Sequence, residues 1–545
     1  MQTVTVAQYL ARRLGELGVE HLFGVPGDFS LTLLDHMLAE GRQEWVGSPN
    51  ELGAGYAADG YARTRGMAAM VTTFGVGELS AIDAVAGAYA ENVPLVQITG
   101  APPTTSAAAG RLLHHTLGDG DFGRFARAYA EVTAAGAVLT ARDAAERIDD
   151  VLATAVRELR PVYLAVPVDV ATALVLAPAA PLPLTATDER AVGRFRSAAA
   201  DLLGGARSAV LVAGHLVERS GAVDRFARLV DAAASPVVTL VSARGAVDPG
   251  SPHFAGVYCG TIGAKRAILA VDTADVVIEA GTLMADAVTG MFSHRDDPAH
   301  TIHLGLHGAT VAGSRIDGVP FATALDVLTE LVDGAALRRD LPDTAPEGPE
   351  AGPALDQATL WAHLEGWFPH GHRLVTDIGT TFWGAAGITL PAGSDVVAQP
   401  VWSSIGYALP AALGCAVADP ERRPVLVIGD GAAQMTVQEL STLARLPQPP
   451  VVIVVDNSGY TIERALQSPA AVYNDVAPWD WCALARAFAP GVPMVTAEPA
   501  TPGELDEALA AVSCSPDSLV VLHVRTDPLD LPAGLRGLAD NYHGR

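Results

Sequence analysis

Two short stretches in the last third of the chain place oxygen-bearing side chains directly after apolar runs. Asp430 follows PVLVIG in the motif GDGAAQM, and Asn457 follows VVIVVD in the motif DNSGYTIE. Because the carboxyl ends of parallel strands meet at one edge of a sheet, both side chains should lie at that edge. Their oxygens and the carbonyl of Gly459 suit Mg²⁺. Gly429 and Gly431 would let backbone N–H groups approach a phosphate at the start of the next helix.

Another polar stretch, LLHHTLGDGDF at 112–122, holds two adjacent histidines and two carboxylates. His114 and His115 are followed by Asp119 and Asp121. Residues of these types could bind a metal ion, form a phosphate loop or transfer protons. The Gly-Asp-Gly of this stretch follows no apolar strand, which argues against the phosphate loop. The residues by themselves leave the other two readings open.

The elements that must position these residues alternate between short apolar runs and longer helical patterns. This alternation predicts an α/β fold of three Rossmann-like domains, with parallel sheets covered by helices. Pro-rich stretches at 176–188 and 341–354 predict linkers, and the predicted domains span 1–180, 189–340 and 355–545. Strands are expected at 67–74, 94–100, 208–214, 236–243, 274–281, 301–306, 424–431 and 449–457, and helices at 52–63 and 436–446.

The first and third segments share an arrangement that the middle segment lacks. TTFGVGELS at 72–80 and VIGDGAAQM at 427–435 both read as a strand, a Gly-x-Gly turn and a helix. This similarity suggests two related α/β domains that flank a different middle domain. In the middle segment, VAGHLVE at 212–218 is the nearest approach to a G-x-G-x-x-G dinucleotide motif and does not match it. No flavin site is therefore expected there.

Composition narrows the class of partner. The chain has 545 residues and a formal net charge of −26, which argues against nucleic acid and anionic membranes as partners. Four separated cysteines indicate reduced thiols rather than a disulfide scaffold or structural zinc. The uncharged stretch 396–418 contains Pro400 and Pro410, so a buried helix with its preceding loop is favoured over a membrane span. The N-terminus lacks the apolar core of a signal peptide, and we expect a cytoplasmic protein.

Seven motifs spread over nearly the whole chain resemble the thiamine-diphosphate (ThDP)-dependent 2-oxo-acid decarboxylases, the family of pyruvate, indolepyruvate and branched-chain 2-oxo-acid decarboxylases. The resemblance implies pyrimidine, middle and diphosphate domains of the ThDP-binding fold. One position departs from the family pattern, because Asp456 stands where an asparagine is usual, beside the matching Asn457. The motifs are GVPGDFSLTLLD (24–35), NELGAGYAADGYAR (50–63), TTFGVGELSAIDAVAGAYAENVP (72–94), HHTLGDGDF (114–122), SSIGYALPAALG (403–414), GDGAAQMTVQEL (429–440) and DNSGYTIERALQSPAAVYND (456–475).

The resemblance also implies a role for individual residues at the cofactor. Glu51 would hydrogen-bond to the aminopyrimidine of ThDP and help to turn it into an internal base, although a glutamate that simply starts a helix is common. Ile405 would support a bent conformation of the cofactor. Asp430, Asn457 and Gly459 would bind Mg²⁺. The other implied cofactor-binding residues are Ser404, Gly429, Gly431, Ala432, Tyr460 and Thr461.

Four further residues are implied to handle protons beside the substrate. They are Asp28, His114, His115 and Glu463. With Mg²⁺ assigned to the later motifs, metal binding becomes the weaker alternative for the histidines, and the two carboxylates that follow them would shape the loop. The implied reaction is the non-oxidative decarboxylation of a 2-oxo acid to an aldehyde and CO₂, through ylide and enamine forms of the cofactor.

The substrate pocket that the family implies is apolar. This favours an aromatic 2-oxo acid such as indolepyruvate or phenylpyruvate, or a branched-chain one, over a dicarboxylic 2-oxo acid. Phe382 and Trp383 could stack on an aromatic substrate or simply narrow the pocket. The implied pocket residues are Phe382, Trp383, Ala287, Val288, Ile462, Leu466, Leu535 and Leu538.

The last expectations concern the assembly of the protein and its alternative functions. The family works as a dimer of dimers with the cofactor between the first domain of one subunit and the third domain of its partner, so a homotetramer is expected. The alternatives are a carboligase that forms acyloins, a pyruvate-preferring decarboxylase and a catalytically silent scaffold. The scaffold is disfavoured by the joint retention of Glu51, His114, His115, Asp430, Asn457 and Glu463.

Overall fold

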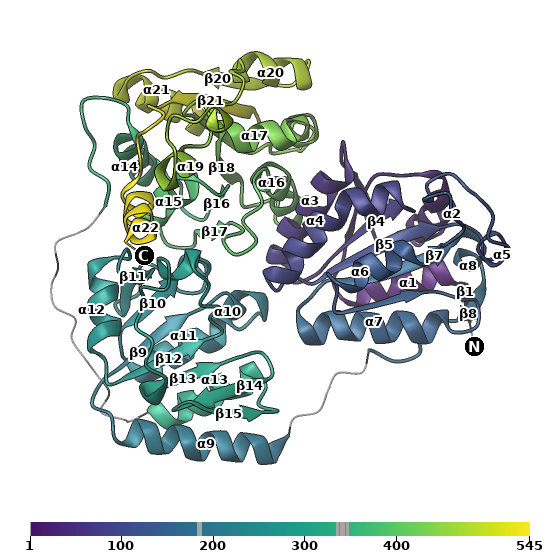
Figure 1. Cartoon of the computed structure of the whole chain (residues 1–545), viewed down its shortest axis with the longest axis horizontal. Coiled ribbons are helices and arrows are strands. Elements are labelled where there is room, and N and C mark those ends of the chain that lie inside the picture. The colour runs from purple at the N-terminus through teal and green to yellow at the C-terminus, as the bar shows by residue number, and fades with distance from the viewer. Residues whose placement is uncertain (1, 183–187, 334–336, 338–343, 345–347, 545) are drawn as a thin grey trace. The chain divides into compact units, whose positions relative to one another are not determined.

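The computed structural model describes residues 2–182, 188–333, 337, 344 and 348–544. It contains three large sheets, one in each predicted segment (Figure 1). The predicted linkers fall partly outside the described residues, at 183–187, 341–343 and 345–347, so for those residues the linker assignment stays a prediction.

The first sheet has six parallel strands in the order β3-β2-β4-β5-β7-β6. Helices α1, α2 and α7 pack on one face, and α3 and α4 cover the other (Figure 1). Side chains along β4 alternate between the two faces of the sheet. Val71 packs in the core with α1, α2 and α7, whereas Met70 lies near Gly55 of α3. The strands are β2 (His21–Gly24), β3 (Glu44–Gly47), β4 (Ala68–Thr73), β5 (Leu95–Ala101), β6 (Ala135–Val138) and β7 (Val162–Pro167); the helices are α1 (Val6–Glu16), α2 (Asp28–Leu38), α3 (Glu51–Arg65), α4 (Val76–Ala90), α5 (Thr104–Ala108), α6 (Arg124–Ala130), α7 (Ala144–Glu158) and α8 (Val168–Ala171); β1 (Thr3–Thr5) and β8 (Leu174–Leu176) form a separate antiparallel pair.

The middle sheet has seven strands in the order β11-β10-β9-β12-β13-β14-β15. Its first five strands are parallel, and four of them, β9, β10, β12 and β13, were predicted. The sequence reading missed β11 and the antiparallel hairpin of β14 and β15 that extends the sheet. β14 has the sequence GATV, with only one large apolar residue, and β15 has the polar sequence SRID, so neither forms an apolar run. The strands are β9 (Ala209–Ala213), β10 (Val237–Leu240), β11 (Phe254–Tyr258), β12 (Val276–Ala280), β13 (Thr301–Leu304), β14 (Gly308–Val311) and β15 (Ser314–Asp317); the helices are α9 (Glu189–Gly204), α10 (Leu216–Arg219), α11 (Val223–Ala233), α12 (Lys265–Thr273), α13 (Phe321–Val332) and the 3-10 turns η1 (Ala287–Thr289) and η2 (Pro298–His300).

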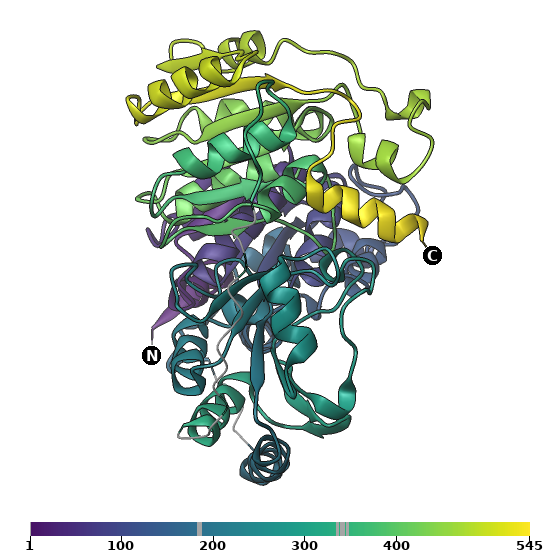
Figure 2. The same cartoon turned by 90° about the vertical axis from the view of Figure 1, so that its left-hand side faces the viewer.

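The third sheet has six parallel strands in the order β17-β16-β18-β19-β21-β20. Counted along the chain, this is the strand order of the first sheet, which supports the suggested relationship between the two segments. The C-terminal helix α22, yellow in Figure 2, packs on α15 and α19. The strands are β16 (Arg373–Thr376), β17 (Asp395–Val397), β18 (Pro424–Gly429), β19 (Val451–Asp456), β20 (Met494–Ala497) and β21 (Leu519–Arg525); the helices are α14 (Gln357–Trp367), α15 (Thr380–Ala386), α16 (Ala408–Ala418), α17 (Asp430–Thr436), α18 (Leu440–Leu443), α19 (Thr461–Leu466), α20 (Trp481–Phe488), α21 (Pro502–Ser513), α22 (Ala533–His543) and the 3-10 turns η3 (Val437–Glu439) and η4 (Val472–Asn474).

The helix predicted at 436–446 is wrong in its bounds and its continuity. A helix begins earlier, at Asp430, and the segment then passes through η3 into the short helix α18. Thr436, with φ −138° and ψ 24°, ends the first helix, and its hydroxyl donates a hydrogen bond to the carbonyl of Gly406. Asp430 and Gly431 are therefore the first residues of a helix.

Contacts divide the chain into two compact units. The first unit contains residues 1–185, 406–421 and 436–447, and the second contains the rest. Helix α16 thus belongs to the first unit, where it packs on α3 through small residues: a β-carbon at Gly60 would clash with the carbonyl of Ala411. This close approach accounts for the Ala- and Gly-rich sequence of both helices.

The uncharged stretch at 396–418 ends in α16, which is almost wholly buried, as predicted. Among the described residues, no helix has the length and apolar character needed to cross a membrane.

Candidate active site

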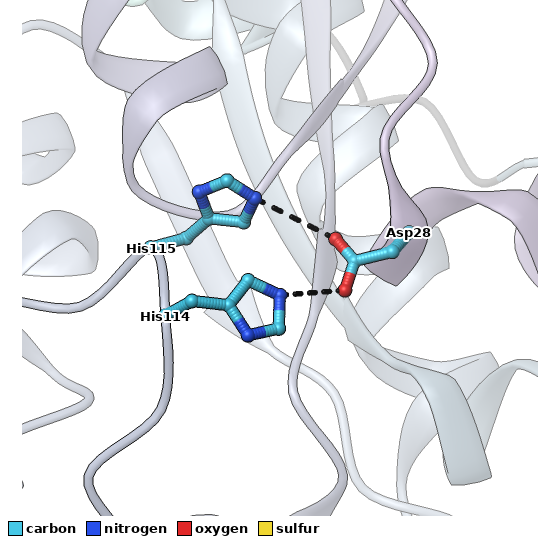
Figure 3. A group of neighbouring side chains, drawn as sticks. All are labelled: Asp28, His114 and His115. Carbon is cyan, nitrogen blue, oxygen red and sulfur yellow. Dashed lines mark hydrogen bonds and ion pairs between the residues drawn. The ribbon is translucent and has the colours of Figure 1, made fainter.

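Asp28, His114 and His115 form a cluster in the first unit (Figure 3). Asp28 is the first residue of α2, and the histidines lie in the loop after α5. His114 Nε2 lies 2.7 Å from one carboxylate oxygen of Asp28, and His115 Nε2 lies 3.7 Å from the other. The side chains are 48%, 60% and 30% exposed, in the order Asp28, His114, His115. The cluster can therefore exchange protons with solvent or with a bound molecule.

Packing fixes the orientation of the two histidines. The ring of His114 stacks on Phe29, with 5.0 Å between ring centroids and 13° between ring planes. His115 has a φ of 60°, an uncommon conformation outside glycine. Its carbonyl approaches Gly75 so closely that a β-carbon there would clash with it. Backbone strain of this kind is typical of functional sites and persists only where the surroundings impose it.

The carboxylates that follow the histidines shape the loop, as expected. Asp119 accepts a hydrogen bond from the Arg124 guanidinium at 2.7 Å, and Asp121 accepts one from Arg127 at 2.6 Å. The ligand atoms of the cluster itself lie within 4.8 Å of one another, so its spacing is compatible with a metal ion as well as with proton transfer. The geometry leaves both of those readings open for His114 and His115.

Glu51 starts α3, at the carboxyl edge of the same sheet. Its predecessor Asn50 caps the helix by accepting a hydrogen bond from the Gly53 N–H at 2.7 Å. One Glu51 carboxylate oxygen would lie 3.1 Å from a β-carbon at Gly77, in the first turn of α4. Glu439, a buried carboxylate that the sequence reading missed, approaches so closely that a β-carbon at Gly53 would clash with it. Burial raises the pKa of Glu439 to about 7.

Three oxygen atoms converge where β18 and β19 end in the second unit. The amide oxygen of Asn457 lies 2.6 Å from the Gly459 carbonyl oxygen and 3.3 Å from Oδ1 of Asp430. Turning this amide over would replace the convergence by hydrogen bonds to the same two oxygens, whereas a bound cation would select the oxygen-inward orientation. Neighbouring ligands of an octahedral Mg²⁺ lie roughly 3 Å apart, since Mg–O distances are about 2.1 Å. The donor set therefore fits a small divalent cation.

Burial and local charge support the same reading. Asp430 and Asn457 are only 3% and 2% exposed. Burial, and next the neighbouring carboxylate of Asp456, raise the pKa of Asp430. A cation bound at this carboxylate would offset both effects, because it favours the ionised form.

The turn between β19 and α19 is held by contacts that the sequence reading missed. The guanidinium of Arg464 donates to the carbonyls of Asn457 and Ser458 at 3.2 and 2.8 Å. The ring of Tyr460 packs so close to Gly431 that a β-carbon there would lie 2.5 Å from it. A β-carbon at Gly429 would meet nothing within 4 Å, so the end of β18 is open to a phosphate.

The remaining predicted cofactor residues lie in the second unit, as does Glu463, which is exposed on α19. Asp28, Glu51, His114 and His115 lie in the first unit. The predicted residues are therefore divided between the two units. Ser404 and Ile405 lie in the turn before α16, Ala432 in α17, Tyr460 just before α19 and Thr461 at its start.

The predicted substrate residues come together only in part. Six of the eight belong to one apolar cluster, with Ile462 packed against a core of Val288, Phe382, Trp383, Leu535 and Leu538; Ala287 and Leu466 are outside it. A cavity of about 670 Å³ lies beside this cluster and is lined by Trp383, Trp361, Arg244 and Leu531, but not by Ile462 or Glu463. Trp383 is the predicted pocket residue that also lines the cavity.

Comparisons with known proteins find a related domain in each of the three segments. Three family models of thiamine pyrophosphate enzymes match the chain. They are the N-terminal TPP-binding domain (residues 4–123), the central domain (196–331) and the C-terminal TPP-binding domain (377–524). An alpha-keto-acid decarboxylase of Mycolicibacterium paratuberculosis is 44% identical over 97% of this chain and 95% of its own length. One of Mycobacterium leprae is 43% identical over 98% and 95%. The chain belongs to the thiamine-diphosphate-dependent 2-oxo-acid decarboxylase family.

Proposed function

We propose that this chain is a ThDP- and Mg²⁺-dependent decarboxylase that converts a 2-oxo acid into an aldehyde and CO₂. The observation that carries the proposal is the cluster of Asp28, His114 and His115, in which His114 is hydrogen-bonded to Asp28 and His115 lies 3.7 Å from it. Such a cluster offers both a proton donor and a proton acceptor. Release of an aldehyde requires a proton on the carbon that has lost CO₂, and such a cluster can supply it. The name of the alpha-keto-acid decarboxylase relatives describes the same reaction class.

The second unit would hold the cofactor. Asp430, Asn457 and the Gly459 carbonyl would bind Mg²⁺, and the backbone after β18, with the open space at Gly429, would receive the diphosphate. When bound, ThDP supplies the electron sink that allows the bond to the departing carboxylate to break. Ser404, Ile405, Ala432, Tyr460 and Thr461 complete the proposed cofactor set.

The chain's own acid–base residues would manage the protons. Glu51 would hold a proton at the aminopyrimidine. His114, oriented by Asp28 and Phe29, would pass a proton to or from the reacting carbon, since imidazole both donates and accepts near neutral pH. His115 and the exposed Glu463 would assist.

The substrate proposed is an aromatic or branched-chain 2-oxo acid. Phe382 and Trp383 lie in an apolar cluster with Val288, Leu535 and Leu538, which favours an apolar side chain on the substrate. The proposal also includes Mg²⁺ as the cation, a homotetramer with sites shared between subunits, and a cytoplasmic location.

A coupled aldehyde assay with ThDP and Mg²⁺ tests the function and the substrate separately. Pyruvate, a branched-chain 2-oxo acid, phenylpyruvate and indolepyruvate are supplied one at a time. We expect kcat/KM for the best apolar substrate to exceed that for pyruvate about tenfold or more. A preference for pyruvate would overturn the substrate assignment alone. Acyloin in excess of aldehyde from a single 2-oxo acid would overturn the decarboxylase in favour of a carboligase.

A further inference from the structure

Asp456, the residue that departs from the family pattern, uses both of its carboxylate oxygens. It is the last residue of β19 and directly precedes Asn457. Its Oδ1 accepts a hydrogen bond from the Ser458 N–H at 3.0 Å. Its Oδ2 lies 2.8 Å from Nε2 of His523 on β21. The carboxylate thus joins the turn after β19 to the neighbouring strand.

That turn carries two of the three oxygens of the proposed cation site. Ser458 has a φ of 57° and Gly459 a φ of 132°, so the backbone is held in a conformation that most residues avoid. Gly459 also donates its N–H to Oδ2 of Asp430 at 2.9 Å. A shift of the turn would move the Asn457 amide and the Gly459 carbonyl together, and Asp456 fixes it at Ser458.

His523 is well placed to anchor Asp456. Its side chain is fully buried, and β21 pairs in parallel register with β19. At Nδ1 of His523, the Arg525 guanidinium lies 3.3 Å away and a carboxylate oxygen of Glu498 lies 3.6 Å away. The closer guanidinium fits Nδ1 as acceptor, with the proton on Nε2 for donation to Asp456. Glu498 in turn lies 3.0 Å from Arg525.

We propose that His523 is a positioning residue for the cation site, and that Asp456 and His523 form a matched pair. Through Asp456, His523 fixes the turn that presents Asn457 and Gly459 to the cation. An aspartate at position 456 is tolerated in this partly buried place because His523 compensates its second oxygen. The inference rests on the proposed Mg²⁺–ThDP site.

The pairing gives an asymmetric expectation for single and double substitutions. Removing one partner of a buried pair leaves an uncompensated charge, whereas replacing both is often close to neutral. His523→Leu should raise the Mg²⁺ concentration needed for half-maximal ThDP binding about tenfold, the usual cost of losing an outer partner of a metal site. Asp456→Asn keeps an acceptor for Ser458 and should change it at most about threefold. The double variant should resemble Asp456→Asn.

Tryptophan fluorescence during Mg²⁺ titration at fixed ThDP measures this without any assay of turnover. The matched control is His303→Leu, which removes the partner of Glu279 (3.0 Å) from two parallel strands of the middle sheet. That variant should leave the Mg²⁺ dependence unchanged. His523→Gln, which keeps a donor, should recover most of the affinity and serves also if the leucine variant fails to fold.

The outcomes separate this inference from the proposed function. Failure of the unsubstituted protein to bind ThDP with Mg²⁺ would overturn the proposed site itself. Normal binding with an unchanged Mg²⁺ dependence in His523→Leu would overturn the positioning role. A double variant as impaired as His523→Leu would show that the loss does not come from an uncompensated Asp456 charge, and it would overturn the matched pair.

Discussion

The first and third sheets share one strand order but carry opposite kinds of chemistry at their carboxyl edges. After β18 and β19, the third sheet presents Asp430 and Asn457, which are 3% and 2% exposed. After β2 the first sheet presents Asp28, and after β5 it presents the loop that carries His114. Their side chains are 48% and 60% exposed. The same topology therefore supports a closed set of oxygen donors at one edge and, at the other, an open cluster with a proposed acid–base role.

This difference matches the demands of the two tasks. A group that is retained through many turnovers benefits from buried, preorganised donors whose desolvation has already been met in folding. A group that exchanges protons with each substrate must be accessible to that substrate. A few contacts are enough to hold such an exposed residue in a strained backbone conformation, as at His115. The comparison predicts that substitutions at the two edges will fail in different ways.

The largest effect is expected at the acid–base edge, from Glu51→Gln. The amide keeps the shape of the side chain but cannot hold the proton that the proposed mechanism assigns to Glu51. Turnover should fall roughly 10³-fold while the protein still binds ThDP. Steady-state rates together with fluorescence titration of ThDP check both halves of this expectation.

Glu44→Gln is the matched control, since Glu44 is an exposed glutamate on β3 of the same sheet. It should behave as the unsubstituted protein. Rates close to normal in Glu51→Gln would exclude a proton-handling role for Glu51, whereas loss of ThDP binding would mean that Glu51 acts mainly by holding the cofactor.

The second prediction concerns whether a single chain supplies both sheet edges of one active site. Asp430→Ala alone should bind ThDP about 10²-fold more weakly, because it loses a cation ligand. If each site combines the edges of two subunits, co-expression of Asp430→Ala with Glu51→Gln gives hybrid dimers that hold one site with both original residues. Activity should then return to about a quarter of normal, given random pairing of subunits.

A mixture of Glu51→Gln with Asp28→Asn is the control, because both changes lie at the first edge. Every site of such hybrids keeps one defect, so activity should stay low. Absence of recovery in the first mixture, with hybrids demonstrated by differently tagged subunits, would mean that each chain holds a complete site.

The strands that carry the sites could be predicted because buried parallel strands are continuous apolar runs. The predictions of β4, β18 and β19 agree with the structure to within one or two residues. The hairpin of β14 and β15 was missed, since strands of four residues with polar members leave no such run. Helix 436–446 was misjudged because its break at Thr436 depends on a hydrogen bond to Gly406, which is far away in sequence.

The site shows the same limit. Asp430 and Asn457 could be found because each directly follows a recognisable strand. His523 lies within the apolar run LVVLHVR and Arg464 within a helix, so nothing local marks either as a partner of the turn after β19. His523 reaches the turn because β21 pairs with β19, and Arg464 reaches it because its guanidinium donates to the carbonyl of Ser458. Such partners are defined only by tertiary structure.

The smallest effect concerns Glu439, a carboxylate from the third segment that lies in the first unit near the start of α3. Burial raises its pKa to about 7 in the folded protein, partly offset by Thr442 and Arg445. A carboxyl group whose pKa is raised by folding contributes most below its unfolded pKa and loses that contribution as the pH rises through 7. Glu439→Gln removes this loss, so the variant should gain stability over the original protein between pH 5 and pH 8.

The gain at pH 8 should be about 2 kcal/mol, because a shift of one pKa unit corresponds to roughly 1.4 kcal/mol and part of the shift is lost with the partners. Denaturant unfolding of the cofactor-free protein at pH 5 and pH 8 measures it. Glu421→Gln, at an exposed position of the same unit, should show no dependence on pH. A Glu439→Gln variant less stable than the original at pH 8 would mean that the carboxylate is ionised and compensated in the fold. Glu439 would then be a charged residue of the folded protein, like those at the acid–base edge, rather than a neutral buried one.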